Sequence, residues 1–293
     1  MKGVMFVMLF FISSCKAQDK VTFKTSSNAN TLLWQISGKG IAAPSYLFGT
    51  FHLICKEDIP FGKQLKQAVQ ATTEIYMELD MDDPATVLGG LKYMNMRDDS
   101  TLKKLYSEAE YNKLAAFFKD SMQLPLAMFQ HMKPFFVSAL LYPKMLACKT
   151  TGGVEDELVK LAREYKKQVQ GLETMAFQAS VFDSIPYVQQ GRELLKMVDS
   201  IAAYRQYFEG MVKVYKSQQL KEIEDMLASD KFAMEENQDI LLNKRNANWV
   251  LQLNTIMKKQ PVFIAVGAGH LVGEKGLISL LKQEGYTVIP IEN

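Results

Sequence analysis

Short apolar runs near both ends of the chain predict the strands of one sheet. Residues 31–38 alternate apolar and polar positions, and 45–51 follow after a turn rich in glycine, proline and small residues, which predicts a β-hairpin. Residues 261–267 form a continuous apolar run that ends in glycine, which is typical of a buried parallel strand. An amphipathic helix over 276–284 and an apolar run over 287–291 complete this end of the chain.

Two further strands are predicted in the middle of the chain, over 74–80 and 168–173, and the remaining pattern is helical. We therefore expect an α/β fold whose central mixed sheet is built from both chain ends. Large helical insertions are expected at about 83–149 and 176–259, the second divided into about three long helices, as a cap over the strand ends. Because both ends supply core strands, we expect one domain over 31–293.

Two of the three histidines in the chain occur in the same short motif. His52 follows Gly49 at the end of one predicted strand, and His270 follows Gly267 at the end of another. Parallel strands bring their carboxyl ends to one edge of a sheet, which is where open α/β sheets bind ligands. We therefore expect both histidines in one site. The alternative for each is a hydrogen-bonded residue of the core or of a turn.

Carboxylates end two other predicted strands. Glu78 and Asp80 end the first of these strands, and Glu173 ends the second. Solvation at a strand end is the alternative for each, and Glu173 with Thr174 could instead cap the next helix. Arg245 lies in the last helix of the second insertion, where a surface ion pair is the alternative.

Two imidazoles and one carboxylate can hold a catalytic divalent metal and leave positions open for water and substrate. The residues that we predict as ligands are His52, His270 and Glu78. A metal so held lowers the pKa of its bound water, which supplies hydroxide near neutral pH. The third histidine, His131, lies beside Lys133-Pro134 in a helical region, and we expect it to be structural or at the surface.

Other residues would support this chemistry. We predict that Glu173 or Asp80 acts as a general base, and that Arg245 holds a substrate carboxylate or a developing oxyanion. Glycine lets the backbone approach a bound group closely. We expect such a cofactor-binding role of three glycines: Gly49, Gly267 and Gly269.

The first 14 residues have the pattern of a lipoprotein signal peptide. Lys2 precedes nine apolar residues, and Ile12-Ser13-Ser14 leads into Cys15, as in a bacterial lipobox. We expect lipidation of Cys15, a polar tether over 15–30, and anchoring to a membrane of the bacterial cell envelope, facing the periplasm or the cell exterior. The alternative is an ordinary secretory signal in which Cys15 is incidental.

Two cysteines remain if Cys15 carries the lipid. Disulfides persist in an oxidising compartment, so Cys55 and Cys148 could pair, but the sequence alone does not show that they are close. Cys55 lies three residues after His52 and could instead be a metal ligand. Both alternatives remain open at the level of the sequence.

The overall charge argues against a nucleic-acid partner. The chain has 34 basic and 32 acidic residues, a net charge of +2, and no long run of either sign. Nucleic-acid binding requires a clustered basic face. HExxH, P-loop, nucleophile-elbow and GxGxxG motifs are also absent from the sequence.

Several of these motifs, in this order, resemble the TraB/PrgY/GumN family, to which the Tiki metalloproteases are similar. The resemblance covers about 32–291, and its C-terminal block is the most specific part. The matching segments are Gly49–His52, Met77–Asp80, Gly171–Thr174 with Gln178, Arg245-Asn246, and Val266–Gly273 with Gly276-Leu277.

The resemblance implies a Tiki-like or ChaN-like α/β fold with helical insertions and two GxxH motifs facing one site. For Tiki-like members it implies peptide-bond hydrolysis that depends on manganese or cobalt rather than zinc. It assigns metal or catalytic roles to His52, His270 and Glu78, supported by Glu173 and Arg245. One departure is Glu155, where the family pattern suggests aspartate, so the resemblance assigns Glu155 no role.

The sequence thus favours an envelope lipoprotein with a metal-dependent hydrolase domain that acts on a peptide or small-molecule substrate. The alternative is a non-catalytic protein that captures a peptide, haem or metal on the same face, since imidazole is a usual axial ligand of haem. A third possibility is a structural envelope protein whose GxxH turns serve only the fold. The sequence does not indicate an oligomeric state.

Overall fold

The computed structural model describes residues 23–24, 30–84, 89–229 and 237–293. The predicted signal peptide, the lipidation site Cys15 and most of the tether over 15–30 lie outside the described residues. Among the helices that are described, none is both long and apolar enough to cross a bilayer.

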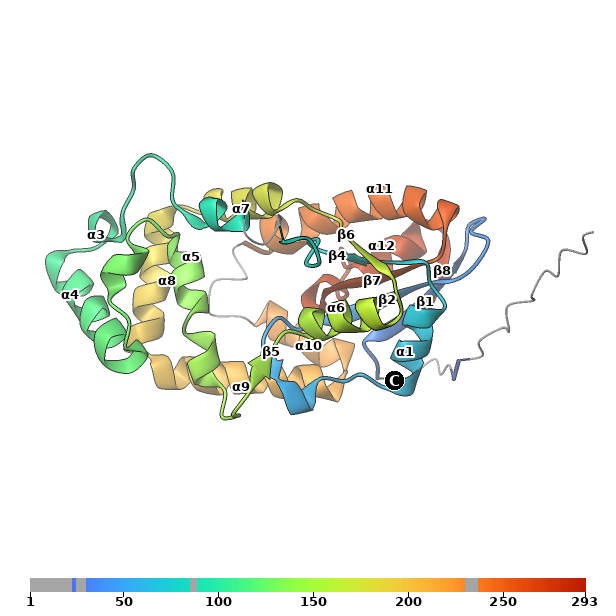
Figure 1. Cartoon of the computed structure of the whole chain (residues 1–293), viewed down its shortest axis with the longest axis horizontal. Helices are drawn as coiled ribbons and strands as arrows, with labels where there is room; N and C mark the ends of the chain where they lie inside the picture. The colour runs from blue at the N-terminus through green and yellow to red at the C-terminus, as the bar shows by residue number, and fades with distance from the viewer. Residues whose placement is uncertain (1–22, 25–29, 85–88, 230–236) are drawn as a thin grey trace, which may run out of the picture.

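A six-stranded mixed sheet forms the centre of the α/β part, and all six predicted strands belong to it (Figure 1). In spatial order the strands are β6 (Gln168–Gly171), β4 (Glu74–Met77), β7 (Val262–Gly267), β2 (Ser45–Thr50), β1 (Leu33–Gly38) and β8 (Tyr286–Pro290). The first four of these strands are mutually parallel, while β1 runs antiparallel to both of its neighbours. Both chain ends supply strands, which confirms the predicted fold class.

Helices cover both faces of the sheet, which explains why β7 is apolar at almost every position. Phe263 and Ala265 face one core, which α1 (Lys63–Gln70) and α6 (Val154–Glu164) cover. The alternate β7 residues face a second core, covered by α11 (Lys244–Lys259) and α12 (Leu277–Gln283). The result is a three-layer arrangement, as expected for a sheet with a buried parallel centre.

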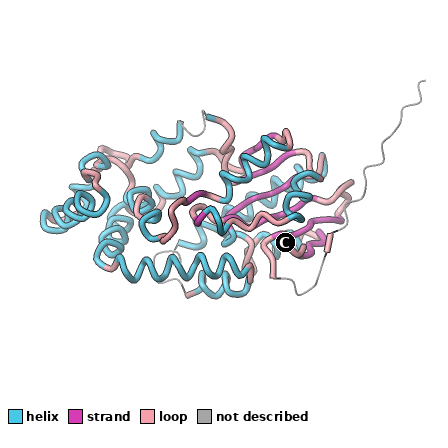
Figure 2. The backbone as a smooth tube through the Cα atoms, turned by 60° about the horizontal axis from the view of Figure 1, so that its bottom comes forward, coloured by secondary structure: helices cyan, strands magenta, loops and turns pink. Residues whose placement is uncertain are grey.

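The remaining helices extend from one end of the sheet (Figure 2). The strands gather at one end of the molecule, and helices alone form the other end. The α-helices of this part are α3 (Leu102–Leu105), α4 (Glu108–Phe117), α5 (Pro134–Ala139), α7 (Met175–Asp183), α8 (Tyr187–Asp199), α9 (Ile201–Ser217) and α10 (Leu220–Ala228). Short 3-10 or π turns are η1 (Lys56–Asp58), η2 (Leu91–Met94), η3 (Phe118–Met122), η4 (Leu126–Phe129), η5 (Tyr142–Met145), η7 (Asp239–Asn243) and η8 (Ala268–His270).

The second insertion differs from the prediction in two ways. We expected about three long helices in this insertion, including the last one. Its described part instead contains five helices, which are α7 to α10 followed by α11. The last helix, α11, does not belong to a cap: Trp249, Val250, Leu253 and Met257 form an apolar stripe that packs on the sheet. The prediction extended the cap too far because amphipathic periodicity does not say which surface a helix covers.

The described part of the predicted tether is docked on the α/β part. Phe23 packs against Tyr46, with 5.2 Å between the ring centroids. The backbone N–H of Lys24 donates to Gln64, and its carbonyl accepts from Glu292. Phe23 and Lys24 therefore contact the fold, although they lie within the predicted tether over 15–30.

A second, two-stranded sheet was not predicted. It pairs β3 (Ile54–Cys55) with β5 (Thr151–Gly152), which are too short to show a periodic pattern. A disulfide joins Cys55 to Cys148 beside this ladder, with 5.8 Å between the Cα atoms. The disulfide resolves the alternative that the sequence left open and removes Cys55 as a metal ligand.

Candidate active site

The carboxyl ends of four adjacent parallel strands place the predicted site residues in a row. The sheet order gives Glu173 after β6, Glu78 after β4, His270 after β7 and His52 after β2. The backbone ladder continues past β4 and β6, since Glu173 N–H donates to the carbonyl of Glu78. Strands β2 and β7 pair with Thr50 opposite Gly267, so their two turns emerge side by side.

His270 is buried, and its ring is held in one orientation. Its Nδ1 lies 2.6 Å from Asn246 Oδ1, and the Asn246 side-chain N–H donates to the backbone carbonyls of His270 and Lys275. Because an amide oxygen only accepts, Nδ1 carries the proton and Nε2 presents a lone pair. Trp249 packs against the ring with 4.5 Å between centroids. Burial lowers the pKa of His270 to about 3, so this imidazole is neutral.

His52 is exposed and pairs with a carboxylate. Its Nδ1 lies 2.7 Å from Glu155 Oε1, which also accepts from Thr50 Oγ1 at 2.5 Å. The His52 side chain is 72% exposed, whereas that of Glu155 is 14% exposed. The negative charge of Glu155 is the main reason that the pKa of His52 rises to about 9. Burial alone would raise the pKa of Glu155, but His52 lowers it overall.

Glu78 connects the two histidine turns. Its Oε1 accepts from Gly267 N–H at 2.9 Å and lies 3.7 Å from His270 Nε2. Its Oε2 accepts from Arg245 Nη2 at 2.5 Å and from Gln178 at 3.2 Å. Burial alone would raise the pKa of Glu78, but the neighbouring histidines and arginine, with the Gly267 N–H, lower it to about 2. Glu78 is therefore ionised at all physiological pH values.

Arg245 is buried in the site and is not a surface residue. Its Nε donates to Glu173 at 2.9 Å, and its Nη2 donates to both Glu173 and Glu78. Its Nη1 donates to the Leu241 carbonyl and lies 3.3 Å from His270 Nε2. Every nitrogen of the guanidinium thus has a partner within the fold, so Arg245 positions the carboxylates and does not reach toward solvent.

Glu173 and Asp80, the two predicted general bases, have other roles in the structure. The Glu173 side chain is 1% exposed and bound by Arg245. Asp80 Oδ1 accepts from the backbone N–H groups of Asp82 and Asp83, which closes the turn after β4. Thr174, rather than Glu173, caps α7 by accepting from Phe177 N–H.

The three predicted cofactor-binding glycines have different surroundings. A Cβ at Gly267 would lie 3.3 Å from Glu78 Oε1, 3.6 Å from His270 Cδ2 and 3.9 Å from His52 Nε2, so the absence of a side chain leaves a small notch between these three groups. Gly49 instead allows close packing against Ala268, and Gly269 packs against Leu227. Only Gly267 faces the candidate site.

Two residues contribute to the site beyond the predicted set. Glu155 was assigned no role, yet it holds His52, and Asn246 holds His270. The only signal for Glu155 was its place at the start of a helix after a double glycine, where Gly153 lets α6 begin against the carbonyl of His52. The third histidine, His131, is exposed and remote in sequence from this cluster, as expected.

The donor set fits a divalent cation. Both Nδ1 atoms are engaged by partners in the protein, as is usual for metal-ligating histidines, so the Nε2 atoms are the ones that could bind an ion. His270 Nε2 accepts from Arg245 Nη1 at 3.3 Å, and His52 is protonated at neutral pH because its pKa is about 9, so an ion would displace this hydrogen bond and this proton. Three carboxylates, Glu78, Glu155 and Glu173, and one guanidinium give −3 + 1 = −2 when both imidazoles are neutral. A divalent cation would cancel this charge.

The arrangement is more open than a closed metal site. Among the described residues, Cys55, Glu57 and Cys148 form the only trio of potential ligands whose donor atoms all lie within 4.8 Å of each other. There, both sulfurs are already joined in the disulfide. In the histidine cluster, His52 is therefore the outlying member, and its exposed side chain would have to move inward to share an ion with Glu78 and His270.

Comparison with known proteins agrees with this architecture. The profile of the TraB/PrgY/gumN family matches residues 32–290, almost the whole chain. The chain belongs to the TraB/PrgY/gumN family. The family match includes all four strand ends that carry the site.

The chain is also similar to three proteins that are named as Tiki metalloproteases or their homologue. It is 24% identical to metalloprotease TIKI1 and 22% identical to metalloprotease TIKI2, both of Danio rerio, with 89% and 90% of the chain covered. It is 21% identical to a metalloprotease TIKI homolog of Amphimedon queenslandica, with 97% covered. The matches span 63%, 61% and 66% of those proteins, respectively. No solved structure matches the chain significantly.

Proposed function

We propose that this chain is a lipid-anchored protein of the bacterial cell envelope that hydrolyses peptide bonds with a divalent metal ion. The observation that carries the proposal is the pair of imidazoles whose Nδ1 atoms are fixed and whose rings flank the Gly267 notch beside Glu78. The similarity to the Tiki metalloproteases supplies the reaction class. The membrane anchor rests on the residue pattern around Cys15.

In this proposal His52 Nε2, His270 Nε2 and Glu78 Oε1 hold the ion. When bound there, a divalent metal polarises the peptide carbonyl and lowers the pKa of water. The permanent charge of Glu78 supplies an anionic ligand. Asn246 and Glu155 hold a proton on Nδ1 of each imidazole, so that Nε2 is the nitrogen that would bind the ion once His52 loses its second proton and His270 Nε2 releases Arg245.

Glu173 and Arg245 act as positioning residues. Glu173 fixes the guanidinium through two of its nitrogens, and Arg245 in turn holds Glu78 Oε2, which directs Oε1 toward the notch. This assignment replaces the general-base role of Glu173 and the substrate-holding role of Arg245. Since Asp80 closes a turn, it supports the loop after β4 and not the chemistry.

The same face would also serve a non-catalytic binding protein. Its donor set favours a small cation over haem, because the His270 side chain is 5% exposed and its ring lies against Trp249. A haem plane needs an open apolar surface at its axial ligand, and His270 offers none. His270 is therefore unsuited to be an axial haem ligand, and a peptide or a metal ion is the ligand that this alternative favours.

The test is equilibrium dialysis of the purified protein against manganese, cobalt and zinc, followed by elemental analysis. His131→Ala is the matched control, since it removes the histidine outside the site. We expect about one ion per chain in the parent and in His131→Ala, and none in His52→Ala/His270→Ala. Equal metal content in all three proteins would refute the site.

A peptide-library digest with the metal-loaded parent then separates the two functions. Hydrolysis that the double variant lacks would support the enzyme. Stoichiometric metal without hydrolysis would identify a binding protein.

A further inference from the structure

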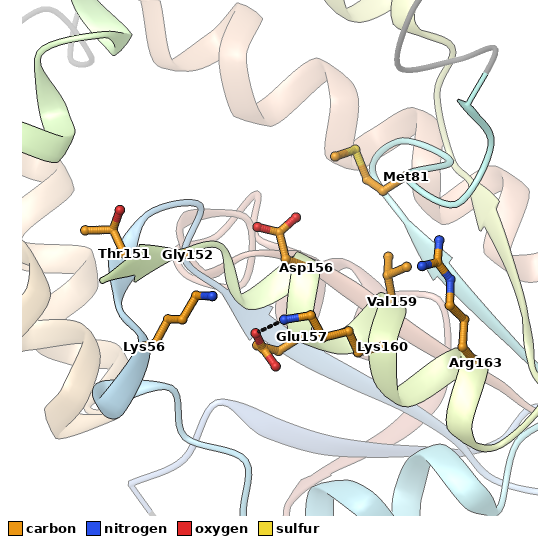
Figure 3. Close-up of a pocket in the computed structure, with 9 residues that line it drawn as sticks. All are labelled: Lys56, Met81, Thr151, Gly152, Asp156, Glu157, Val159, Lys160 and Arg163. Carbon is orange, nitrogen blue, oxygen red and sulfur yellow. Dashed lines mark hydrogen bonds and ion pairs between the residues drawn. The ribbon is translucent and has the colours of Figure 1, made fainter. Parts of the chain in front are cut away.

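A polar hollow of about 370 Å³ lies beside the His52 turn (Figure 3). In Figure 3, Lys56, Thr151 and Gly152 lie at one end, Met81 and Arg163 lie at the other, and the first turns of α6 run between them. The hollow thus connects the disulfide-linked β3–β5 ladder with the loop after β4.

The residues that build this hollow also support His52. Gly152 and Asp156 line the hollow, while Glu155, between them, holds His52 Nδ1. A Cβ on Gly153 would lie only 2.9 Å from the His52 carbonyl, so the two segments touch at this point. Since consecutive Cα atoms are about 3.8 Å apart, Gly152 and Glu155 lie within about 11 Å of each other.

Three cations line the hollow, and two of them are already neutralised. Lys160 pairs with Glu157 at 2.5 Å, and Arg163 pairs with Asp82 at 2.6 Å. Among the described residues, Lys56 has no carboxylate within ion-pair distance, although two acidic side chains line the same hollow. Lys56 is therefore the cation of the hollow that is left for a ligand, and among the described residues Asp156, which accepts from the Gly153 N–H, is the lining carboxylate left without a cation.

The backbone of Lys56 is held by its surroundings, while the residue as a whole is exposed. It follows Cys55 of the disulfide, and its backbone N–H donates to the Thr150 carbonyl. Its aliphatic chain crosses Gly152, where a Cβ would lie 3.1 Å from Lys56 Cε. In Figure 3 the ammonium group consequently points into the hollow.

We propose that this hollow is a subsite for a carboxylate of the peptide substrate, with Lys56 Nζ as the donor. The proposal rests on the proposed peptidase function and adds a substrate class to it. An extended peptide advances about 3.3 Å per residue, so a short peptide bound at the histidine cluster would place a carboxylate in the adjoining hollow. The carboxylate is either the C-terminus of a short peptide or an acidic side chain.

The test is an NMR titration of the metal-free protein, so that binding is measured without hydrolysis. The reporters are the backbone amides of Thr151 and Gly152. One probe is tri-alanine with a free C-terminus, the second is its C-terminal amide, and the third is an amidated, N-acetylated Ala-Glu-Ala. Binding of the first alone identifies the C-terminal carboxylate, binding of the third alone identifies an acidic side chain, and the second should not bind.

Variants assign the binding to one side chain. Lys56→Ala should weaken binding at least about fivefold, whereas Lys56→Arg should retain most of it. Lys149→Ala is the matched control, because Lys149 is an exposed lysine beside the same disulfide that does not line the hollow.

Three results would overturn the subsite: no saturable shift with either acid at millimolar concentration, equal binding of the acid and amide peptides, or unchanged binding in Lys56→Ala. Because no metal is present, these results are independent of the dialysis and digest. A protein that binds the acid peptide but neither binds metal nor cleaves would contradict the peptidase function alone.

Discussion

The two Gly-x-x-His turns share a sequence pattern but lie in opposite environments. His270 is buried, donates to an amide oxygen and has a pKa lowered to about 3. His52 is exposed, pairs with a carboxylate and has a pKa raised to about 9. The motif therefore determines where each imidazole is placed, while burial lowers the pKa of His270 and the charge of Glu155 on a distant helix raises that of His52.

The glycines of the two motifs differ in the same way. Strands β2 and β7 pair with Gly49 opposite Val266 and Thr50 opposite Gly267, so the two motifs are offset by one residue. Gly49 serves packing of the neighbouring turn, and Gly267 opens the notch between Glu78 and His52. The His270 turn thus forms the fixed side of the site, and the His52 turn forms the accessible side.

The largest expected effect comes from removing the cation of the fixed side. Arg245→Ala leaves Glu78 and Glu173 buried without their partner, so we expect a loss of roughly 3–5 kcal/mol in the free energy of unfolding. Arg163→Ala is the control, because its ion pair with Asp82 is exposed and should cost about 1 kcal/mol or less. Urea denaturation of both variants measures the difference. Similar losses would show that the fixed side is not held by Arg245.

The second effect concerns the accessible side. The disulfide closes a loop of 93 residues and joins the segment of His52 to that of Glu155, so Cys55→Ser/Cys148→Ser should lower the free energy of unfolding by roughly 2–4 kcal/mol.

The same variant tests whether the two histidine turns are independent, by NMR of the histidine ring protons. Because the chain has only three histidines, these signals can be resolved and assigned by substitution. We expect the His52 signal to move and the His270 signal to stay. Movement of both signals would mean that the two sides are not separate.

The third effect compares the histidines directly. His270→Ala removes a buried ring and leaves Asn246 without its partner, so we expect a loss of roughly 2–3 kcal/mol in the metal-free protein. His52→Ala should cost about 1 kcal/mol or less, since its side chain is exposed. Metal affinity should nevertheless fall in both variants. Equal stability losses would remove the contrast between the two sides, even if metal binding fell as expected.

The predictable part of the fold is local in sequence. Short apolar or alternating runs identified all six strands of the large sheet, and strand-end positions identified Glu78, His52 and His270 as neighbours. Predicting these features requires only the spacing of apolar residues along the sequence and the rule that parallel strands bring their carboxyl ends to one edge of a sheet.

What the sequence did not give depends on contacts between distant segments. Glu155 lies 103 residues from His52 and carried no motif, and the partners of Arg245 lie 72 and 167 residues away. Arg245 was expected to face substrate, but its bond pattern is set by the two carboxylates that happen to meet beneath α11. The β3–β5 ladder was missed because two residues per strand show no alternation.

The smallest expected effect is a pH dependence confined to the accessible side. The pKa of His52 rises from 6.5 to about 9 on folding, so the pair with Glu155 contributes fully below pH 6.5 and is lost as the pH rises through about 9. The pKa of Glu155 is lowered, so on the acid side the contribution is present above its ordinary value of 4.5 and lost as the pH falls through its folded value.

The Glu155→Gln variant isolates the contribution of the His52–Glu155 pair to the free energy of unfolding. With chelator present, the parent should exceed the variant by about 1 kcal/mol near pH 6, since exposure of His52 screens the pair. The difference should shrink toward pH 9, as measured by urea denaturation at each pH. A difference that stays constant from pH 6 to 9 would show that His52 does not hold its proton through Glu155, and the two turns would then differ in burial alone.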